Sequence, residues 1–525
     1  MKVFTSIHAQ EVDRRTQNEY GIAGFDLMLS AGRAIARRLV SEYPSVRRWC
    51  VVCGNGNNGG DGLIVASVLA SEYADRGYSA DVVFLCSSPD LKGEAAQAWD
   101  FLCDVMCKVP SGTVSVRMGV DDLSDRLGTA QGIVDAIFGV GLSRPLADYW
   151  ADAVNLINQC KGRLPIVAVD VPSGLGDAVR GSTAVHADLT VCVGAPKRCL
   201  FAMPDALCAG RIVIEKIQFP DALLSDEEVT ENWEDWTELK SWLPPRPLNA
   251  NKGSFGRLMC VCGSAPYAGA AIFSATAAHR VGTGLVYIAT TREQNAIYKN
   301  ALPESCTIIA PSADPDFLDG QSAEILQRML PKMNAVVIGP GLGCSDGTQK
   351  LVSVLLRDLQ TDKAPAVVID ADGLNCIAAS VIPFQAQNAE HCVITPHPGE
   401  AARLLGKTID EIQIDRCATA RALAKQFSAV VLLKGACTVI ARPDAQLWMD
   451  NYASPVLSRG GTGDVLSGLI GGLMAQGLTS WKAAVLGCRL LARAGDECCR
   501  RMDERGVMIR DLLAALPTVF DEKSK

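Results

Sequence analysis

The sequence has no run of eighteen apolar residues, the length that a helix needs to cross a membrane, so we expect no transmembrane segment. The first thirteen residues lack the apolar core of a signal sequence. An excess of basic residues is also missing, because 50 Lys and Arg stand against 58 Asp and Glu and give a net charge of −8. These absences argue against a polyanion partner. They predict a cytoplasmic protein with neither a nucleic-acid nor a membrane partner.

Cysteine is plentiful, but it lacks the spacing of a metal site. The chain has 20 cysteines, and no CxxC pair recurs at the spacing of a zinc site. Many lie inside apolar, strand-like stretches, where a thiol behaves as a small hydrophobic side chain. We therefore interpret these thiols as reduced and structural. They include Cys53, Cys192, Cys260, Cys262, Cys392 and Cys437.

The chain lacks a repeat of fixed period, so a solenoid is not expected. Its composition is that of an ordinary globular protein, with 48% hydrophobic and 21% charged residues. Short apolar runs alternate with helix-length segments in both halves, which is typical of parallel sheets covered on both faces. We expect strands at residues 49–53, 80–85, 132–138, 165–171, 189–193 and 211–217, and at 257–262, 285–290, 335–338, 366–370, 392–395, 429–433 and 438–441.

A change in composition separates the two halves. Residues 226–245 begin with an acidic stretch and end in a cluster of prolines, which is typical of a domain junction. A surface helix is the alternative for the acidic part. The predicted fold class is therefore α/β with two domains, a Rossmann-like doubly wound sheet in residues 1–225 and a second α/β domain in residues 246–525.

The most distinctive segment of the first half is residues 53–62, CGNGNNGGDG. It follows an apolar strand and opens a predicted helix with the apolar residues Leu63, Ile64 and Val68. It is neither a GxGxxG fingerprint with a ribose-binding acid nor a P-loop. Its glycines permit close approach of a ligand, and the helix start offers unpaired N–H groups to a phosphate. We interpret it as a ligand-binding turn, with a glycine-rich turn that binds nothing as the alternative.

Three later turns place polar side chains at the ends of predicted strands, the edge where open α/β sheets bind ligands. They are residues 135–145 (DAIFGVGLSRP), 170–174 (DVPSG) and 194–197 (GAPK). Each turn alone is a weak signal, because an Asp that ends a buried strand often only caps a helix. The three turns together, in this order after the glycine-rich segment, are a stronger indication of a binding site.

In this order the turns resemble the NAD(P)H-hydrate epimerase family over roughly residues 1–220, as do Leu27-Met28 and Ala31-Gly32 in the first predicted helix. The resemblance implies binding of hydrated NADH or NADPH (NADHX and NADPHX), with Asp170 and Lys197 as the catalytic residues that transfer protons. It also implies a K⁺ ion held by amide, carboxylate and hydroxyl oxygens, which suit a hard cation. The implied residues are Asn57, Asn58, Gly59, Gly60, Asp61, Gly139, Val140, Gly141, Leu142, Ser143, Arg144, Pro145 and Asp170 for the hydrate, and Asn58, Asp135 and Ser173 for potassium.

The strongest motif in the second half is residues 459–468, RGGTGDVLSG. Its glycines form an anion cradle at the start of a predicted helix, whose apolar stripe continues through Leu469, Ile470 and Leu473. Asp464 stands in the first turn, where a carboxylate can take a proton from an alcohol that faces a phosphoryl donor. The alternative is an acidic residue that only complements the helix dipole.

This GTGD segment resembles the ribokinase-like fold, an α/β/α sandwich, and seven further motifs narrow the resemblance to the ADP/ATP-dependent NAD(P)H-hydrate dehydratase family over residues 246–517. They are residues 252–256, 263–270, 282–284, 339–343, 370–375, 395–400 and 434–438. The resemblance implies that a nucleotide phosphorylates the C6 hydroxyl of the S hydrate with Asp464 as base, after which phosphate leaves. Mg²⁺ is expected with the ADP or ATP. The implied residues are Ala270, Gly341, His397 and Asp464 for the hydrate, and Lys434, Gly435, Ala436, Cys437, Thr438 and Gly463 for the nucleotide.

Two positions depart from the family pattern. Asn251 stands where a His is usual before Lys-Gly, so no acid–base role is assigned there, and Ser30 stands where an acid is common. A competing interpretation is a ribokinase-like small-molecule kinase fused to a nucleotide-binding domain. A second is a ligand sensor without turnover, against which the intact Asp135, Asp170 and Asp464 argue. The resemblance predicts a homo-oligomeric repair enzyme and leaves open ADP against ATP and NADH-hydrate against NADPH-hydrate.

Overall fold

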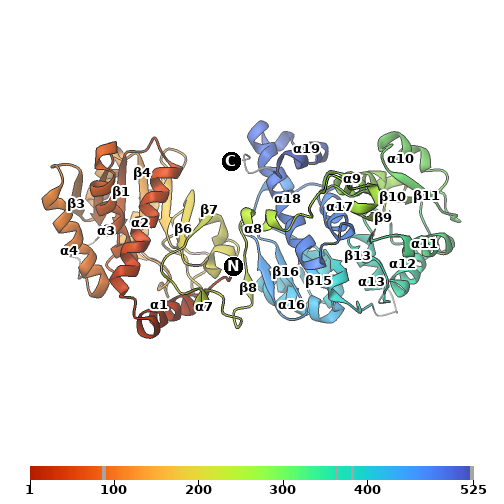
Figure 1. The fold of residues 1–525 in the computed structure, drawn as a ribbon, viewed down its shortest axis with the longest axis horizontal. Coiled ribbons are helices and arrows are strands. Elements are labelled where there is room, and N and C mark those ends of the chain that lie inside the picture. The colour runs from red at the N-terminus through yellow and green to blue at the C-terminus, as the bar shows by residue number, and fades with distance from the viewer. Residues whose placement is uncertain (86–89, 362, 380–383, 521–525) are drawn as a thin grey trace. The chain divides into compact units, whose positions relative to one another are not determined.

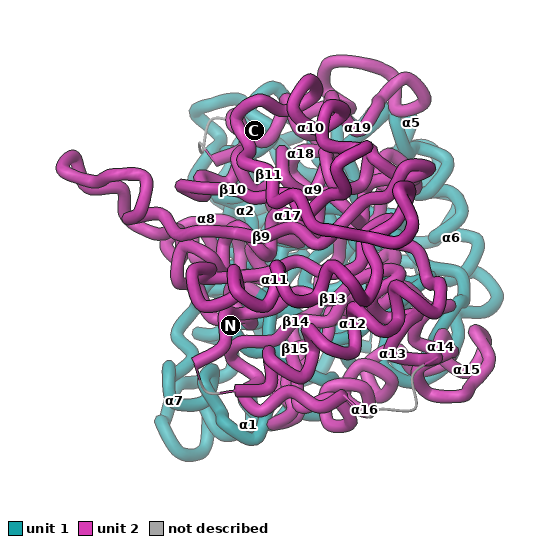
Figure 2. The backbone as a smooth tube through the Cα atoms, turned by 90° about the vertical axis from the view of Figure 1, so that its right-hand side faces the viewer, with its two compact units in different colours: residues 1–233 teal, residues 234–525 magenta. Residues whose placement is uncertain are grey.

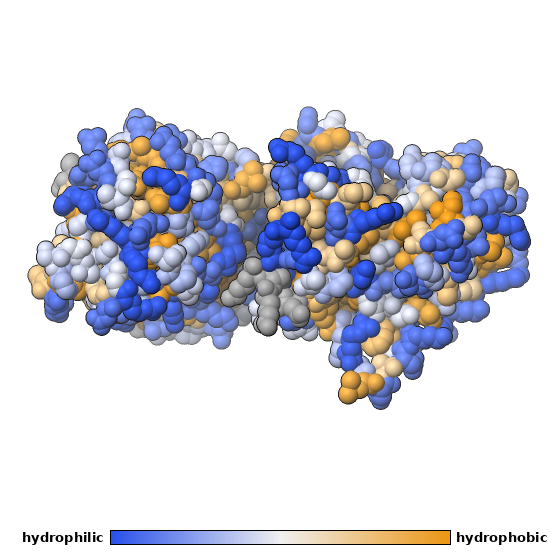
Figure 3. Space-filling model, turned by 90° about the horizontal axis from the view of Figure 1, so that it is seen from above, coloured by the Kyte–Doolittle hydropathy of each residue, from blue (hydrophilic) through white to orange (hydrophobic). Residues whose placement is uncertain are grey.

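The structure, a computed structural model, describes residues 1–85, 90–361, 363–379 and 384–520 (Figure 1). It divides into two compact units, Met1–Trp233 (unit 1) and Glu234–Lys525 (unit 2), which Figure 2 shows in different colours. The expected junction at 226–245 spans this division. Within the described residues no helix is both long and apolar enough for a transmembrane span. Hydrophilic and apolar side chains are interspersed on the face seen in Figure 3.

Unit 1 is built on a parallel sheet with the strand order β3-β2-β1-β4-β5-β6-β7. In the register of its centre, Val51 of β1 lies between Val82 of β2 and Val134 of β4. The strands are β1 (Arg48–Cys53), β2 (Ser79–Phe84), β3 (Val114–Met118), β4 (Gly132–Ala136), β5 (Ile166–Val169), β6 (Leu189–Val193) and β7 (Arg211–Glu215), and the two-residue strand β8 (Glu231–Asn232) follows near the end of the unit.

Helices cover both faces of this sheet, and two apolar clusters fill the layers between. On one face Ile35 of α2, Leu63 of α3 and Leu102 of α4 pack with Val51, and on the other Leu123 of α5 packs with the opposite side of the strands. The helices are α1 (Ser6–Tyr20), α2 (Gly24–Glu42), α3 (Asn57–Glu72), α4 (Gly93–Lys108), α5 (Val120–Thr129), α6 (Asp148–Asn158) and α7 (Asp221–Leu224). This is the doubly wound arrangement that the sequence predicts.

Unit 2 has a larger sheet in which β11-β10-β9-β12-β13-β14-β15 are parallel and β16 and β17 are antiparallel. The strands are β9 (Arg257–Val261), β10 (Leu285–Thr290), β11 (Cys306–Ile309), β12 (Ala335–Ile338), β13 (Ala366–Ile369), β14 (Cys392–Ile394), β15 (Val430–Leu433), β16 (Val439–Ala441) and β17 (Leu447–Met449). The helices are α8 (Trp236–Ser241), α9 (Ala268–Arg280), α10 (Asn295–Ala301), α11 (Ala323–Met329), α12 (Asp346–Asp358), α13 (Asp372–Ala379), α14 (Pro398–Leu405), α15 (Ile409–Ile414), α16 (Arg416–Phe427), α17 (Thr462–Ala475), α18 (Ser480–Arg501) and α19 (Ile509–Ala515).

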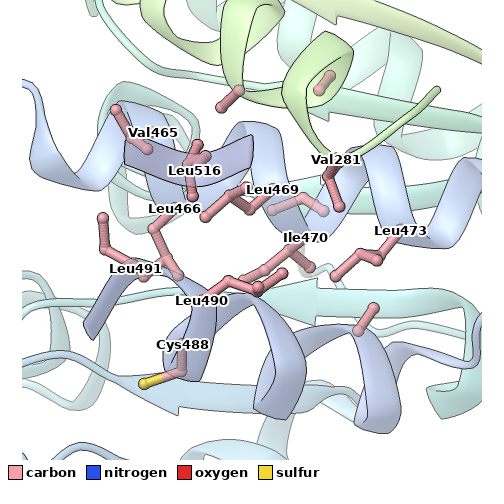
Figure 4. Packing of buried hydrophobic residues seen from close by; sticks show 14 of the residues in the cluster. Val281, Val465, Leu466, Leu469, Ile470, Leu473, Cys488, Leu490, Leu491 and Leu516 are labelled. Atoms are coloured by element: carbon pink, nitrogen blue, oxygen red, sulfur yellow. The ribbon is translucent and has the colours of Figure 1, made fainter. Parts of the chain in front are cut away.

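Helix α17 is central to one face of this sheet. Figure 4 shows its stripe Val465, Leu466, Leu469, Ile470 and Leu473 packed against α18. Each fully buried Leu or Ile stabilises the fold by roughly 1.5–3 kcal/mol. Glycines let other elements approach closely: a Cβ at Gly468 would lie 2.1 Å from a carbonyl oxygen of α9, and one at Gly471 would lie 2.5 Å from a methyl group of β12. This packing fixes the amino end of α17, which carries the GTGD motif.

The α/β class with two sheets is confirmed, and every predicted strand is present, with ends that differ from the expected ones by two residues at most. One expectation was wrong: the helix that carries Leu27 and Met28 is the second helix, because α1 precedes it. The cysteines named above as structural are buried thiols.

Candidate active sites

The glycine-rich segment of unit 1 joins β1 to α3 by close approach of backbone to backbone. A Cβ at Gly54 would lie 2.1 Å from the carbonyl oxygen of Ile137, and one at Gly59 would lie 1.9 Å from that of Gly54. Side chains are excluded from both positions. The residues expected as a binding loop, Asn57–Asp61, are instead the first turn of α3, whose N-cap is Gly56. The ligand-facing groups here therefore stand at a helix N-terminus.

A pocket opens beside this turn. Of the residues expected to contact the hydrate, Asn57, Asp61, Val140 and Asp170 line it, and Lys197 does so as well. Gly59 and Gly60 are buried. Gly139, Gly141, Leu142, Ser143, Arg144 and Pro145 are not among the lining residues. The full lining is Phe4, Ala9, Val12, Asp13, Gln17, Gly24, Leu27, Met28, Ala31, Asn57, Asp61, Glu94, Val140, Asp170, Val193, Ala195, Lys197, Ile217, Phe219 and Leu224.

Lys197 and Asp170 form an ion pair in the wall of this pocket. The ammonium of Lys197 also donates to the carbonyl oxygen of Val193 at 2.8 Å, and the N–H of Val193 donates to Asp170 Oδ1 at 3.1 Å. Burial lowers the pKa of Lys197, but the charge and hydrogen bond of Asp170, together with Cys192 and Asp13, outweigh it and raise the pKa overall. Asp170 has φ 64°, a left-handed conformation that is strained for a residue with a side chain. The strand end thus holds this acid–base pair in a fixed position.

Two more carboxyl groups share the environment of Lys197. Burial raises the pKa of Asp13 to about 6, with Lys197 lowering it and Asp170 raising it. Burial and the charges of Asp170 and Asp13 raise the pKa of Asp61 well above its usual value. The sequence analysis identified Asp61 but missed Asp13, as well as Gln17 and Glu94, which also line the pocket. For Asp13 and Gln17 the available signal was α1 itself, whose polar sequence was not recognised as a helix, whereas Glu94 lies in the first turn of α4.

Asp135 and Ser173, two of the expected potassium ligands, are in direct contact. Asp135 accepts hydrogen bonds from the hydroxyl of Ser173 at 2.6 Å and from its N–H at 2.8 Å. Burial raises the pKa of Asp135 to about 6 although both bonds lower it. The third expected ligand, Asn58, packs against Gly139, where a Cβ would lie 3.2 Å from Asn58 Oδ1. The hydroxyl oxygen of Ser173 also accepts a hydrogen bond from the N–H of Phe138 at 2.9 Å, so both side chains reach residues 138–139.

In unit 2 the GTGD motif forms the first turn of α17. Gly461 is the N-cap, with φ 99°, and a Cβ there would lie 3.0 Å from Ile509. Asp464 stands in this first turn, where burial and the charge of Asp370 raise its pKa to about 7 despite the opposing effect of Lys434. A carboxylate with this pKa is suited to act as a general base near neutral pH.

A buried network lies beside Asp464. Lys434 Nζ is 2.6 Å from Asp370 Oδ1 and 3.7 Å from Glu400 Oε2. The hydroxyl of Ser467 donates to Asp370 Oδ2 at 2.7 Å. Burial lowers the pKa of Lys434, and the charges of Asp370 and Glu400 outweigh it and raise the pKa overall. Sequence reasoning named Lys434 but did not assign roles to Asp370 or Ser467.

His397 caps helix α14. Its Nδ1 accepts hydrogen bonds from the N–H groups of Gly399 at 3.0 Å and Glu400 at 3.3 Å, and Glu400 accepts from the N–H of His397 at 2.8 Å. Burial lowers the pKa of His397, although Glu400 raises it. Because Nδ1 is an acceptor, the neutral ring carries its proton on Nε2. Nε2 lies 3.4 Å from Glu400 Oε1, and the imidazole side chain is 49% exposed.

The remaining expected contacts fall into two groups. Ala270 and Gly341 adjoin, since a Cβ at Gly341 would lie 2.7 Å from that of Ala270. Gly463 lies near Lys434, where a Cβ would be 3.5 Å from Nζ. The segment at residues 434–438 is anchored by Arg416, which sequence reasoning missed and which donates to the carbonyl oxygens of residues 433 and 434. Cys437 in this segment is buried, and the hydroxyl of Thr438 donates to the carbonyl oxygen of Gly435 at 3.1 Å.

Comparison with known proteins gives matches in both units. The family model described as "NAD(P)H-hydrate dehydratase" matches residues 258–518, and the one described as "YjeF-related protein N-terminus" matches residues 24–199. Several relatives carry the name "Bifunctional NAD(P)H-hydrate repair enzyme Nnr", and two of them illustrate the match. That of Moorella thermoacetica is 36% identical over 99% of this chain and 97% of its own length. That of Escherichia coli is 33% identical over 97% of this chain and 92% of its own length.

Among solved structures, one titled as an ADP/ATP-dependent NAD(P)H-hydrate dehydratase from Bacillus subtilis, co-crystallised with ATP and Mg²⁺, is similar to 54% of this chain and 97% of its own. Its sequence identity is 26% and its TM-score 0.46.

Proposed function

The chain belongs to the family of bifunctional NAD(P)H-hydrate repair enzymes, and from this premise we propose how its two units divide the work. It repairs hydrated NADH and NADPH by interconverting the R and S hydrates and by dehydrating the S form at the expense of ADP or ATP. We assign epimerisation to residues 1–225 and dehydration to residues 246–525, with residues 226–245 as the junction. The observation that carries the proposal is that each unit places an acid–base group beside a glycine-bearing turn at a helix start.

For the epimerase, we propose Asp170 and Lys197 as the catalytic residues. Inversion at C6 of the hydrated ring needs a proton removed at one point and returned at another. The ion pair of Lys197 and Asp170 supports this role, because it lines the pocket and joins a donor to an acceptor. Asp61 and Asp13 hold protons more tightly than ordinary carboxyl groups and can donate hydrogen bonds to the ligand. The hydrate would also contact Asn57 and Val140.

We propose that Asn58, Asp135 and Ser173 hold a K⁺ ion. The donor chemistry supports it, because amide, carboxylate and hydroxyl oxygens are hard ligands. A second support is that Ser173 contacts both Asp135 and Phe138 while Asn58 Oδ1 faces Gly139, so the oxygens of all three side chains gather around residues 138–139. Bound potassium would supply a positive charge beside the pocket. Asp135 would orient Ser173, and Asn58 would link this site to the first turn of α3.

For the dehydratase, we propose that Asp464 takes the proton of the C6 hydroxyl as the hydroxyl oxygen attacks the terminal phosphoryl group of ADP or ATP. The nucleotide leaves one phosphate shorter, the C6–O bond then breaks with loss of phosphate, and loss of a C5 proton restores the ring double bond. Mg²⁺ bound with the nucleotide would neutralise phosphate charge. Lys434 would balance the remaining charge, since Asp370 keeps it protonated. The buried Thr462 hydroxyl has no hydrogen-bond partner in the described chain and fits a phosphate oxygen.

On the hydrate side we place Ala270, Gly341 and His397. On the nucleotide side we place the segment at 434–438 and Gly463. The support is proximity, since Ala270 adjoins Gly341 and Gly463 adjoins Lys434. The homo-oligomeric state and the cytoplasmic location stay predictions.

The test supplies a mixture of R and S hydrates with ADP or ATP, with and without Mg²⁺, and follows reduced-nicotinamide absorbance and inorganic phosphate together. Repair predicts that absorbance returns with one phosphate released for each ring restored. The alternative function, a small-molecule kinase, predicts that a phosphorylated alcohol accumulates, with no return of absorbance and no release of inorganic phosphate. That result would overturn the dehydratase assignment.

A further inference from the structure

Two cysteine thiols from different elements of unit 2 meet beside the turn that follows β12. Cys344 is exposed and directly follows the glycine turn at 339–343, whereas Cys376 is buried on α13. Their sulfur atoms lie 3.7 Å apart. A disulfide bond is about 2.05 Å long, so the sulfurs need to approach by only about 1.6 Å. We propose that Cys344 and Cys376 form a reversible disulfide when the protein meets a hydroperoxide.

The backbones on both sides of the pair are already joined. The N–H of Gly343 donates to Asp372 Oδ2 at 2.8 Å, which ties the turn to the first residue of α13. Cys376 Sγ lies 4.0 Å from the carbonyl oxygen of Gly343. Gly343 itself has φ 84°, and a Cβ there would lie 2.9 Å from the ring of Phe317. These contacts hold the two elements together with the two sulfur atoms close to one another.

The two thiols differ in the way that a peroxide-reacting pair requires. Cys344 is exposed and can meet a hydroperoxide from solvent. Burial, followed by the neighbouring Cys344, raises the pKa of Cys376, so this thiol stays protonated and is not the first to react. An accessible cysteine next to a resolving cysteine is the usual arrangement at sites of reversible thiol oxidation.

The hydroperoxide is the one co-reactant that the proposed oxidation needs. The thiolate of Cys344 attacks the peroxide O–O bond, giving a sulfenic acid and, with hydrogen peroxide, one water. The sulfur of Cys376 then attacks the sulfenic sulfur, the S–O bond breaks, and the thiol proton leaves with the hydroxide as a second water. Each thiol loses one electron, and the peroxide gains two. An external dithiol reverses the step by thiol–disulfide exchange.

Other cysteines provide comparisons within the same chain. Cys260 and Cys262 are close in sequence, but both are fully buried and closed to a solvent oxidant. Cys107 is exposed on α4 and serves as a control for an accessible thiol elsewhere. The proposed disulfide goes beyond the repair activity. It would join the turn that holds Gly341 covalently to α13, and its detection does not depend on turnover.

The test treats the full-length protein with stoichiometric hydrogen peroxide, alkylates the remaining thiols and maps tryptic peptides by mass spectrometry. The expected product links the peptide at residues 333–350 to the one at 364–403, with fragmentation assigning the bond to Cys376 rather than Cys392. A dithiol should remove it. The link should be lost in Cys376→Ser and in Cys344→Ser and should persist in Cys107→Ser.

Cys344→Ser changes an exposed position and keeps the test valid even where Cys376→Ser impairs folding. In a folded Cys376→Ser protein, a sulfenic-acid probe should label Cys344. Failure of the 333–350 and 364–403 peptides to link in the wild type, or a link from 364–403 to another cysteine, would overturn the proposal. Because the readout is covalent mass, this failure is distinguishable from a failure of the repair assay.

Discussion

Lys434 Nζ lies 2.6 Å from Asp370 Oδ1, and the second oxygen of this buried carboxylate accepts a hydrogen bond from Ser467 on α17. The negative charge of Asp370 is thereby held next to Asp464, whose pKa it raises. The pair therefore does two things at once: it keeps the lysine charged for a phosphate, and it tunes the proposed base.

Removing that charge should change the pH dependence of dehydration. In Asp370→Asn we expect the pKa of Asp464 to fall, because a source of negative charge is gone while Lys434 remains. The acidic limb of kcat/KM should move to lower pH. Ser467→Ala is the matched control, since it removes a hydrogen bond but leaves the charge. An acidic limb at the same pH in Asp370→Asn and the wild type would contradict this tuning.

The protonation state of Asp464 itself sets the second prediction. Its pKa of about 7 means that the carboxyl is protonated, and so inactive as a base, at lower pH. Dehydratase kcat/KM should therefore rise with pH to a plateau, with its midpoint near 7. Asp464→Asn should lower kcat by about 10²- to 10⁴-fold, the usual contribution of a general base. A flat profile between about pH 5.5 and 8.5 would speak against Asp464 as the titrating base.

The ion pair in unit 1 should matter for stability as well as catalysis. In Lys197→Met the carboxylate of Asp170 loses its partner in a largely buried site, which should cost about 3–5 kcal/mol. The Asp170→Asn/Lys197→Met double variant should recover part of this loss. Lys108→Met, which breaks the exposed pair with Asp104, should cost less than about 1 kcal/mol.

The free energies of unfolding of these variants are measured by urea denaturation at pH 7, monitored through the hydrogen exchange of peptides from residues 1–233. At this pH the raised pKa of Lys197 keeps its side chain charged. Equal losses for Lys197→Met and Lys108→Met would show that the buried pair has no special stabilising role.

Potassium should stabilise unit 1 in a pH-dependent way. The pKa of Asp135 is raised to about 6 in the folded protein, so the folded state holds this proton more tightly than the unfolded state does. The proton therefore stabilises the fold at low pH, and this stabilisation is lost as the pH rises through 6. Above that pH a cation can take the place of the proton. Exchanging choline chloride for KCl should therefore raise Tm at about pH 8 but not at about pH 5.

The potassium effect should disappear in Asp135→Asn and Ser173→Ala. Asp81→Asn is the matched control, because Asp81 is a buried carboxylate on β2 bonded to Arg48 and Ser115. A rise in Tm that persists in Asp135→Asn would place the ion elsewhere.

The strands that the sequence predicted best are continuous apolar runs buried on both faces, such as β6, β10 and β12, which match their expected bounds. The strands it missed are β3, β11, β17 and the two-residue β8. Strand β3 is largely exposed beyond Val114, and β11 is also partly exposed. β17 has only three residues. An apolar run is a weak signal where only part of a strand is buried.

Contacts between distant residues were harder to predict. Asp170 and Lys197 were both identified, but their ion pair depends on the left-handed backbone at Asp170, which sequence alone does not specify. Asp13 was missed because its helix is mostly polar, and Arg416 was missed because it acts through backbone carbonyl groups. His397 was expected as a ligand contact, and its role as a helix cap became visible only with the geometry of Gly399 and Glu400.

The most direct test of the account is recovery of reduced-nicotinamide absorbance from a mixture of R and S hydrates with nucleotide and Mg²⁺, in wild type, Lys197→Met and Asp464→Asn. We predict that wild type restores both epimers, Lys197→Met stalls at the S fraction, Asp464→Asn restores neither, and the two variants mixed together recover the whole pool. Full recovery by Lys197→Met at the wild-type rate, or any enzymatic recovery by Asp464→Asn comparable to wild type, would contradict the division of labour between the two units.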